Sequence, residues 1–297
     1  MVVGRWLTRD GLRLLAQRLT HVWRAGLYTA RLTAIDDANT ERSVIFVQAV
    51  HLPSTANRPT TSSNIAFETR SGANNRVWVV NQDNDSVSVF DAVTNAKLAE
   101  INVGVMPRAV AIAPNGNAWV TNKGAATISV ISPSTLAVVQ TINLPYASQP
   151  FGLAFAPTGG SAFVALEASG RLLKLDASSG AQTGALDVGP NVRGVAVTAD
   201  GATVLVSRFV TPRLPGEDTA SVNTSGVGGE VVVVNAGAMT INRTVVLQHS
   251  DKPDTENQGG GVPNYVGAVA ISPDGSTAWH PRSKTTSSAV PCATATG

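Results

Sequence analysis

The chain has 297 residues, of which 43% are hydrophobic and 14% are charged, and its formal net charge is +2. This composition excludes a disordered chain, and no run of about 18 apolar residues is present that would cross a membrane as a helix. The single cysteine, Cys292, excludes an intramolecular disulfide and a paired-thiol zinc or haem site in this chain, so we expect no cofactor within it.

Charge is divided unevenly along the chain. Residues 1–31 hold six Arg and one Asp, whereas residues 32–281 hold 14 basic and 19 acidic residues. A mildly acidic body argues against a nucleic-acid partner, because neutralising phosphates requires clustered Lys and Arg on the folded domain.

Residues 1–25 form a basic segment that lacks the continuous apolar stretch of a secretory signal. Leu12, Leu15 and Leu19 fall near helical spacing, which is compatible with a basic amphipathic helix at a membrane surface or with an organellar presequence. The alternative is an unstructured or wrongly assigned start.

Residues 26–50 contain the pattern G-x-Y-x-x-x-L-T-A-x-D-D, which resembles the last strands of a PKD-like, immunoglobulin-type sandwich. Two strands cannot bury the core of a two-sheet fold, so the resemblance implies a remnant of such a domain. Residues 51–63, rich in Pro, Thr, Ser and Asn, are typical of a linker.

A repeat begins at residue 64 and is marked by turn glycines in the sequences IAPNG, FAPTG, VTADG and ISPDG. These glycines are Gly116, Gly159, Gly201 and Gly275, with spacings of 43, 42 and 74 residues. The first two spacings match the roughly 40 to 45 residues of a four-stranded propeller blade, and the third equals one blade plus about 32 inserted residues.

Each unit contains the pattern of four short strands. In the second unit, alternating small and apolar residues separated by turns predict strands at 108–113, 117–122, 127–132 and 137–143. Such short connections force an antiparallel meander, and the small residues of the first strand suit the crowded inner edge of a blade. The sequence therefore predicts an all-β fold, a β-propeller of four-stranded antiparallel blades.

The motifs WVVN (78–81), WVTN (119–122) and SVSVFD (86–91) are similar to the YVTN-type β-propeller repeat, a bacterial and archaeal module of about 42 residues. The resemblance covers residues 64 to about 280 and weakens at FVAL (163–166) and VLVSR (204–208). It implies a propeller of about seven blades in an exported bacterial protein, located in the periplasm or outside the cell.

Five first strands can be counted, but only four units are complete. The fifth unit ends after GSTAW, and residues 280–297 carry no alternating apolar pattern. We expect residues 64–279 to form part of a larger propeller, followed by an unstructured tail that is either a linker or an out-of-frame translation. The open blade edges of such an array invite association and poor solubility.

The binding face can be predicted from the connections between strands. In a meander the second-to-third and fourth-to-first connections share one face, because connections leave alternately from the two faces. The extra residues of the fourth unit lie in these connections, at 209–229 and 249–264. Loops of this kind carry binding residues, because the rigid sheets position them while the loops vary.

Arg108 and Arg193 occupy equivalent repeat positions at the start of the first strand on this face. Arg208, Asn81 and Asn122 lie nearby by the same reasoning, and together these side chains could bind an anionic group at the channel mouth through forked hydrogen bonds. The alternative is that they are solvated rim residues paired with carboxylates.

The inserted connections also carry acidic side chains, whose oxygens are the ligands that Ca²⁺ prefers. No D-x-[DN]-x-[DN]-G motif accompanies them, so solvated loop carboxylates are the alternative. These candidates are Glu217, Asp218, Asp251, Asp254 and Glu256.

The sequence predicts no catalytic residue and no metal held by histidines. The histidines His21, His51, His249 and His280 share no metal-ligand spacing, and no G-x-S-x-G nucleophile elbow occurs.

These observations predict a noncatalytic propeller module that binds a protein, a small anion or a carbohydrate on the face of the two inserted connections. An alternative is a fragment of a periplasmic c-type cytochrome or peroxidase-like redox protein, in which haem c belongs to a downstream domain. A third hypothesis is a propeller lactonase or hydrolase, although those enzymes use carboxylate and His clusters around the channel.

Overall fold

The computed structural model divides the chain into two compact units, Met1–Thr55 and Ala56–Gly297. The residues described are 26–35, 38–50, 61–157, 159–209, 229–247, 265–272, 274–280 and 288–291. The first unit contains one antiparallel pair, β1 (Gly26–Ile35) and β2 (Glu41–Val50), in which Gly26 lies opposite Val50. The origin of this pair in a PKD-like domain stays a prediction.

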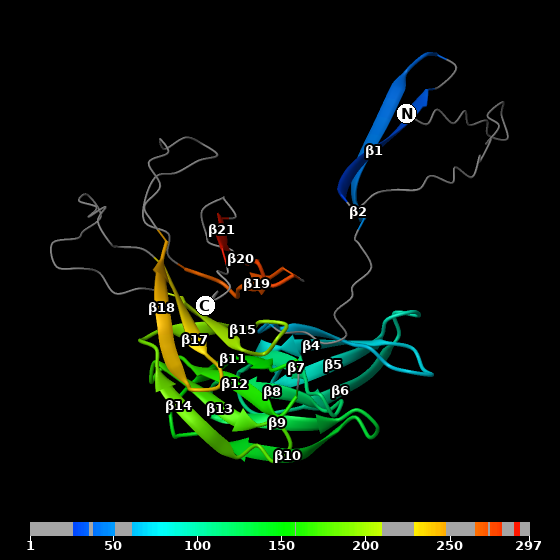
Figure 1. Ribbon diagram of the computed structural model, residues 1–297. Helices are drawn as coiled ribbons and strands as arrows, with labels where there is room; N and C mark the ends of the chain where they lie inside the picture. The colour runs from blue at the N-terminus through cyan, green and yellow to red at the C-terminus, as the bar shows by residue number, and fades with distance from the viewer. Residues whose placement is uncertain are drawn as a thin grey trace. The chain divides into compact units, whose positions relative to one another are not determined.

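The second unit consists of sheets that follow one another along the chain, each a meander of neighbouring antiparallel strands (Figure 1). We number these sheets as blades 1 to 5. Blade 1 comprises β3 (Ile65–Glu68), β4 (Arg76–Asn81), β5 (Ser86–Asp91) and β6 (Lys97–Asn102). Blade 2 comprises β7 (Pro107–Ile112), β8 (Ala118–Asn122), β9 (Thr127–Ser132) and β10 (Ala137–Asn143).

Blades 3 and 4 repeat this order. Blade 3 comprises β11 (Pro150–Phe155), β12 (Ser161–Leu166), β13 (Arg171–Asp176) and β14 (Gln182–Asp187). Blade 4 comprises β15 (Val192–Val197), β16 (Thr203–Arg208), β17 (Glu230–Asn235) and β18 (Thr240–Val246). The prediction of an all-β fold built from four-stranded antiparallel blades is therefore confirmed, whereas the number of blades in a closed propeller stays a prediction.

Blade 5 has three described strands, β19 (Ala270–Ile271), β20 (Thr277–His280) and β21 (Ser288–Pro291). The sequence predicts an unstructured tail from residue 280, whereas β21 pairs with β20 and places Ala289 opposite Trp279. Pairing of backbone groups does not require the alternating apolar pattern that the tail lacks.

Helices contribute little to the described part of the chain. It contains a short 3₁₀ turn, η1 (Gln82–Asn84), and no helix long and apolar enough to span a membrane.

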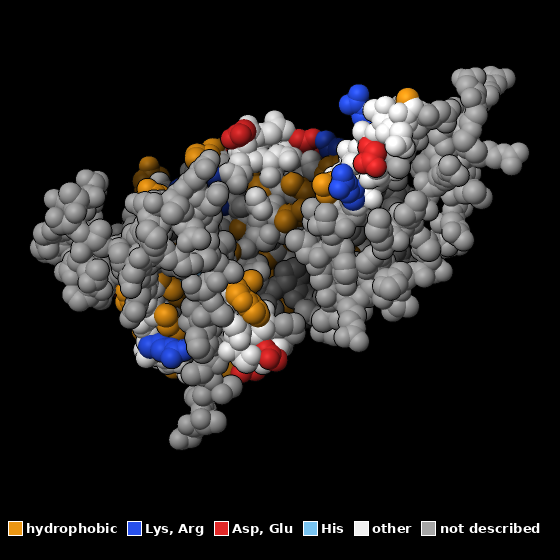
Figure 2. Space-filling view, turned by 90° about the horizontal axis from the view of Figure 1, so that it is seen from above, with side chains coloured by type: hydrophobic (Ala, Val, Ile, Leu, Met, Phe, Trp, Pro, Cys, Tyr) orange, Lys and Arg blue, Asp and Glu red, His pale blue; other side chains and the backbone are white. Residues whose placement is uncertain are grey.

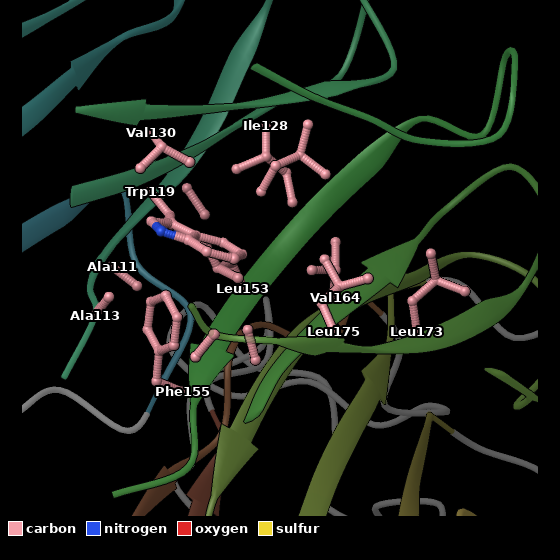
Figure 3. Packing of buried hydrophobic residues seen from close by; sticks show 14 of the residues in the cluster. Ala111, Ala113, Trp119, Ile128, Val130, Leu153, Phe155, Val164, Leu173 and Leu175 are labelled. Atoms are coloured by element: carbon pink, nitrogen blue, oxygen red, sulfur yellow. The ribbon is translucent and has the colours of Figure 1, made fainter. Parts of the chain in front are cut away.

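Apolar packing between consecutive blades forms the core. The indole of Trp119 on β8 meets Phe155 on β11 of the next blade edge to face, with ring centroids 5.2 Å apart, and Leu153 lies beside it (Figure 3). Similar clusters of buried residues join blades 1 and 2, blades 3 and 4, and blades 4 and 5. The blades therefore stack face to face, and the period-two pattern of each strand divides its side chains between two neighbours.

The inner strands β11 and β15 approach each other so closely at Gly152 that no side chain fits there. A Cβ atom at Gly152 on β11 would lie 2.0 Å from the carbonyl oxygen of Arg193 on β15. Residues just before blade 1 lie between these inner strands. Ser62 exchanges hydrogen bonds with Val195 on β15, and the carbonyl of Ser63 accepts from the amide of Val110 on β7. The end of the predicted linker thus ties blades 2 and 4 together.

Asparagine at the end of the second strand holds the beginning of the third strand. Asn122 Nδ2 donates to Thr127 Oγ1 and Ser129 Oγ, both at 3.0 Å. Asn81 makes the corresponding bonds to Ser86 and Ser88 in blade 1. The Asn of the recurring WVVN and WVTN motifs therefore links two strands of its own blade.

Acidic side chains cap the turns that lead from the third strand to the fourth. Asp91 Oδ1 accepts from the amides of Val93 and Thr94, and Asp176 does the same for Ser178 and Ser179. These bonds favour the ionised carboxylate, and the backbone bond from Thr94 is the largest contribution that lowers the pKa of Asp91 from 3.8 to about 2. The hydroxyl of Ser178 contributes most to the lowered pKa of Asp176.

These capped turns predict a loss of stability in acid. Because the folded-state pKa values of Asp91 and Asp176 are lowered, their contribution is present above pH 3.8 and is lost as pH falls toward about 2. We expect the double variant Asp91→Asn, Asp176→Asn to show a smaller fall in Tm between these pH values than the unmodified chain. Asn235 makes the equivalent amide contacts without a charge in blade 4, so the turns should persist. An unchanged pH dependence in thermal melts would contradict this assignment.

Candidate functional site

Two sets of equivalent repeat positions lie at one end of the blades. One set follows the second strand, and the other stands near the start of the first strand; antiparallel pairing places both on the same face. The first set is Gln82, Lys123, Glu167 and Phe209, and the second includes Arg108, Phe151 and Arg193.

The two sets meet across the boundaries between blades. Arg108 Nη1 of blade 2 donates to Gln82 Oε1 of blade 1. Arg193 Nε of blade 4 donates to Glu167 Oε1 of blade 3 at 2.7 Å. In blades 1 to 3 the residue after the second strand thus contacts the first strand of the next blade, which fixes these side chains relative to one another.

Phe151 is the centre of this arrangement. Arg193 Cζ, Lys123 Nζ and Arg108 Cζ lie 4.8, 5.6 and 5.7 Å from the centroid of its ring. The negative face of an aromatic ring attracts cations. Three positively charged side chains from two strand ends and a loop are therefore gathered around one phenyl ring. We call Arg108, Lys123, Phe151, Glu167 and Arg193 the Phe151 cluster.

Glu167 is the carboxylate within this cluster. It is buried and accepts hydrogen bonds from Lys123 Nζ and from Arg193, whose Nη2 lies 2.7 Å from Oε1. The guanidinium of Arg193 also stacks on Phe209, with Cζ 3.5 Å from the ring centroid. One carboxylate against three cations leaves the cluster with two uncompensated positive charges.

Arg108 is the cation of the cluster whose described partners are neutral. Its Nη1 bonds the amide oxygen of Gln82, while its buried Nε has no hydrogen-bond partner in the described part of the chain. No carboxylate of the described residues lies within 4.0 Å of its nitrogens. A guanidinium held in this way has donors free for a carboxylate or phosphate.

Apolar side chains are exposed on the connections of the same face. These fourth-to-first connections carry Val105, Met106, Tyr146 and Tyr265, each of which is at least 42% exposed. Tyr265 contacts Phe209 edge to face, with centroids 5.2 Å apart. Figure 2 shows apolar side chains at the surface in a different view, with Lys, Arg, Asp and Glu side chains scattered among them.

The structure separates the predicted site residues into three groups. Arg108 and Arg193 lie together at Phe151. Asn81 and Asn122 bond within their own blades, and Asn122 is fully buried. Arg208 is also buried, where its Nη1 pairs with Glu230 and its Nε donates to the carbonyl of Pro190 at 3.0 Å.

Arg208 therefore links the second strand of blade 4 to the third strand, as Asn122 does in blade 2. Each is the last residue of the second strand, and each bonds the first residue of the third strand. In blade 4 this pair also joins the two ends of the 209–229 connection.

The acidic candidates lie outside the described residues. Glu217, Asp218, Asp251, Asp254 and Glu256 belong to connections that are not described, so the Ca²⁺ hypothesis stays a prediction. Among the described residues, no group of three or more His, Cys, Asp or Glu side chains could hold a metal ion.

Sequence reasoning missed Lys123, Phe151, Glu167 and Gln82. Their signal was present in the repeat alignment, because each stands at a position equivalent to that of another cluster residue. The residue types at these positions differ from blade to blade, so a search for one recurring residue type does not find them.

The cluster predicts that removal of its carboxylate destabilises the fold. In Glu167→Gln, Lys123 and Arg193 lose their partly buried counter-ion, so we expect the free energy of unfolding to fall by about 1–3 kcal/mol. The loss, measured by urea denaturation, should shrink as salt is added because salt screens the repulsion between the cations. The matched variant Glu100→Gln removes an exposed ionic partner of Lys97 but keeps an amide oxygen that can accept from Asn84 and Ser86, so stability should change little. Equal effects of the two substitutions would contradict this role of Glu167.

Comparisons with known proteins establish the fold. No protein-family model and no curated protein matches the sequence. Among solved structures, hydrazine synthase of Kuenenia stuttgartiensis is similar at a TM-score of 0.57 and 17% identity, over 80% of this chain and 59% of that one. A protein of Desulfotomaculum acetoxidans DSM 771, described as functionally unknown, is similar at a TM-score of 0.53 and 13% identity, over 80% of this chain and 68% of that one. With the successive four-stranded sheets, these likenesses identify the second unit as a β-propeller.

Proposed function

We propose that this chain is a noncatalytic β-propeller binding module that holds an anionic ligand at the Phe151 cluster. The observation that carries this proposal is the grouping of Arg108, Lys123 and Arg193 around one ring with the single carboxylate of Glu167. A carboxylate or phosphate of the ligand would compensate the remaining charge. Arg108 would be the main contact, because its described partner is a neutral amide.

The geometry favours binding of a preformed anion. Guanidinium groups keep their positive charge in proteins, so Arg108 and Arg193 supply fixed cations that do not transfer protons during a reaction. Glu167 serves as a counter-ion for two cations, Lys123 and Arg193. The described residues around Phe151 thus supply orientation and charge, which is what a binding site requires. The redox-fragment and hydrolase hypotheses have no comparable support among the described residues.

The surroundings of the cluster favour a polypeptide ligand. The exposed Val105, Met106, Tyr146 and Tyr265 lie on the connections of the same face. An acidic segment of a protein can place carboxylates on Arg108 and apolar side chains on these residues, whereas a free inorganic anion uses the cations alone. In an exported protein with YVTN-type repeats, this face would capture an acidic segment of another protein of the periplasm or cell exterior.

Binding of two anionic probes tests this proposal. We expect hexaglutamate and inorganic phosphate to bind in isothermal titration calorimetry at low salt, and affinity to weaken as salt is added. Arg108→Gln should weaken hexaglutamate binding about tenfold, because it removes one charge-assisted contact.

The control is Lys97→Gln, which removes a charge from the start of a fourth strand, at the opposite face. It should leave both affinities unchanged. Equal losses in Arg108→Gln and Lys97→Gln would show that binding follows net charge and would refute a site at Phe151. Binding of phosphate alone would refute the polypeptide ligand but keep the anion site.

A further inference from the structure

The first and last described blades each expose side chains whose equivalents in the other blades are buried. The blades can be aligned by their strand register. In each blade, an alanine of the first strand lies opposite a larger residue of the second strand. These alanines are Ala66, Ala111, Ala154, Ala196 and Ala270. The large residue faces the following blade, and the two residues that flank the alanine face the preceding one.

The flanking residues of blade 1 are uncovered. In blades 2, 3 and 4 the equivalent residues are at most 7% exposed, and they are Val110, Ile112, Leu153, Phe155, Val195 and Val197. In blade 1 they are Ile65 and Phe67, which are 52% and 48% exposed. This face of blade 1 therefore has the composition of a blade interface without the blade that would cover it.

The large residue of blade 5 is uncovered in the same way. Its equivalents are between 0% and 3% exposed, and they are Trp78, Trp119, Phe163 and Leu205. Trp279 is 41% exposed. The indole is thus buried at the equivalent positions Trp78 and Trp119 but exposed to solvent at Trp279.

The internal interfaces show what fits each surface. Trp119 packs against Leu153 and Phe155, the pair equivalent to Ile65 and Phe67 (Figure 3). The face of Trp279 and the face of Ile65 and Phe67 are therefore complementary by the same packing that joins blade 2 to blade 3. These free surfaces are sheet faces, and they differ from the hydrogen-bonding edges that the sequence predicts as the sites of association.

We propose that a second copy of this chain covers these surfaces, with Trp279 of one protomer packed between Ile65 and Phe67 of the next. Both halves of the interface stand on each chain, so a second copy supplies the required partner without any new chemistry. The contact is heterologous, because different faces meet. It leaves one face of each kind free on a dimer, and assembly continues until a ring closes or a filament forms.

Sedimentation velocity across a range of protein concentrations tests this proposal. The unmodified chain should associate as concentration rises. Phe67→Asp and Trp279→Ser should each raise the dissociation constant about tenfold or more, because each removes a central apolar contact. Val93→Asp alters an exposed apolar residue between β5 and β6, outside the strands β3 and β20 that carry the two faces, and should associate like the unmodified chain.

Mixing the two variants gives the sharpest result. Phe67→Asp keeps an intact Trp279 face and Trp279→Ser keeps an intact Phe67 face, so the mixture should form one-to-one dimers and nothing larger. An interface between like faces cannot produce this pattern. Ile65→Ser replaces Phe67→Asp if the latter loses its β-sheet circular dichroism. An unmodified chain that stays monomeric, or a mixture that fails to dimerise, overturns the proposal.

Discussion

Burial of apolar side chains between successive blades is the constraint on which the rest of this structure depends. A blade is a small twisted sheet that cannot bury both of its faces alone, so each aromatic or aliphatic residue of a second strand needs the first strand of its neighbour. Trp119 against Leu153 and Phe155 is the clearest case. The same stacking fixes the approach of the inner strands, where Gly152 leaves room for the carbonyl of Arg193.

This packing also builds the candidate site. The cluster residues come from different blades, and none of them would meet its partner unless the blades stacked in register. Arg193 belongs to blade 4, its carboxylate partner Glu167 and the ring of Phe151 to blade 3, and Lys123 to blade 2. The charge at this face is thus a consequence of the blade order.

The fold could be predicted from sequence because the glycine spacing and the period-two strands recur. The site could be predicted only in part. Arg108 and Arg193 recur at one position, but Phe151 replaces them in the blade between, and the aromatic ring is what gathers the cations. Asn122 and Arg208 were expected at the binding face, yet both hold the third strand, a role that the Thr and Glu opposite them already indicated.

The most direct test of the anion site is the ¹⁵N resonance of the Arg108 Nε group in heteronuclear NMR. This nitrogen has no hydrogen-bond partner among the described residues, so a carboxylate bound to the other nitrogens of the same guanidinium should change its environment. During titration with hexaglutamate we expect a saturable shift of Arg108 Nε, while Arg70, near the opposite ends of the strands, keeps its position. Equal shifts of both signals, or a shift of neither, would contradict a specific anion site at Phe151.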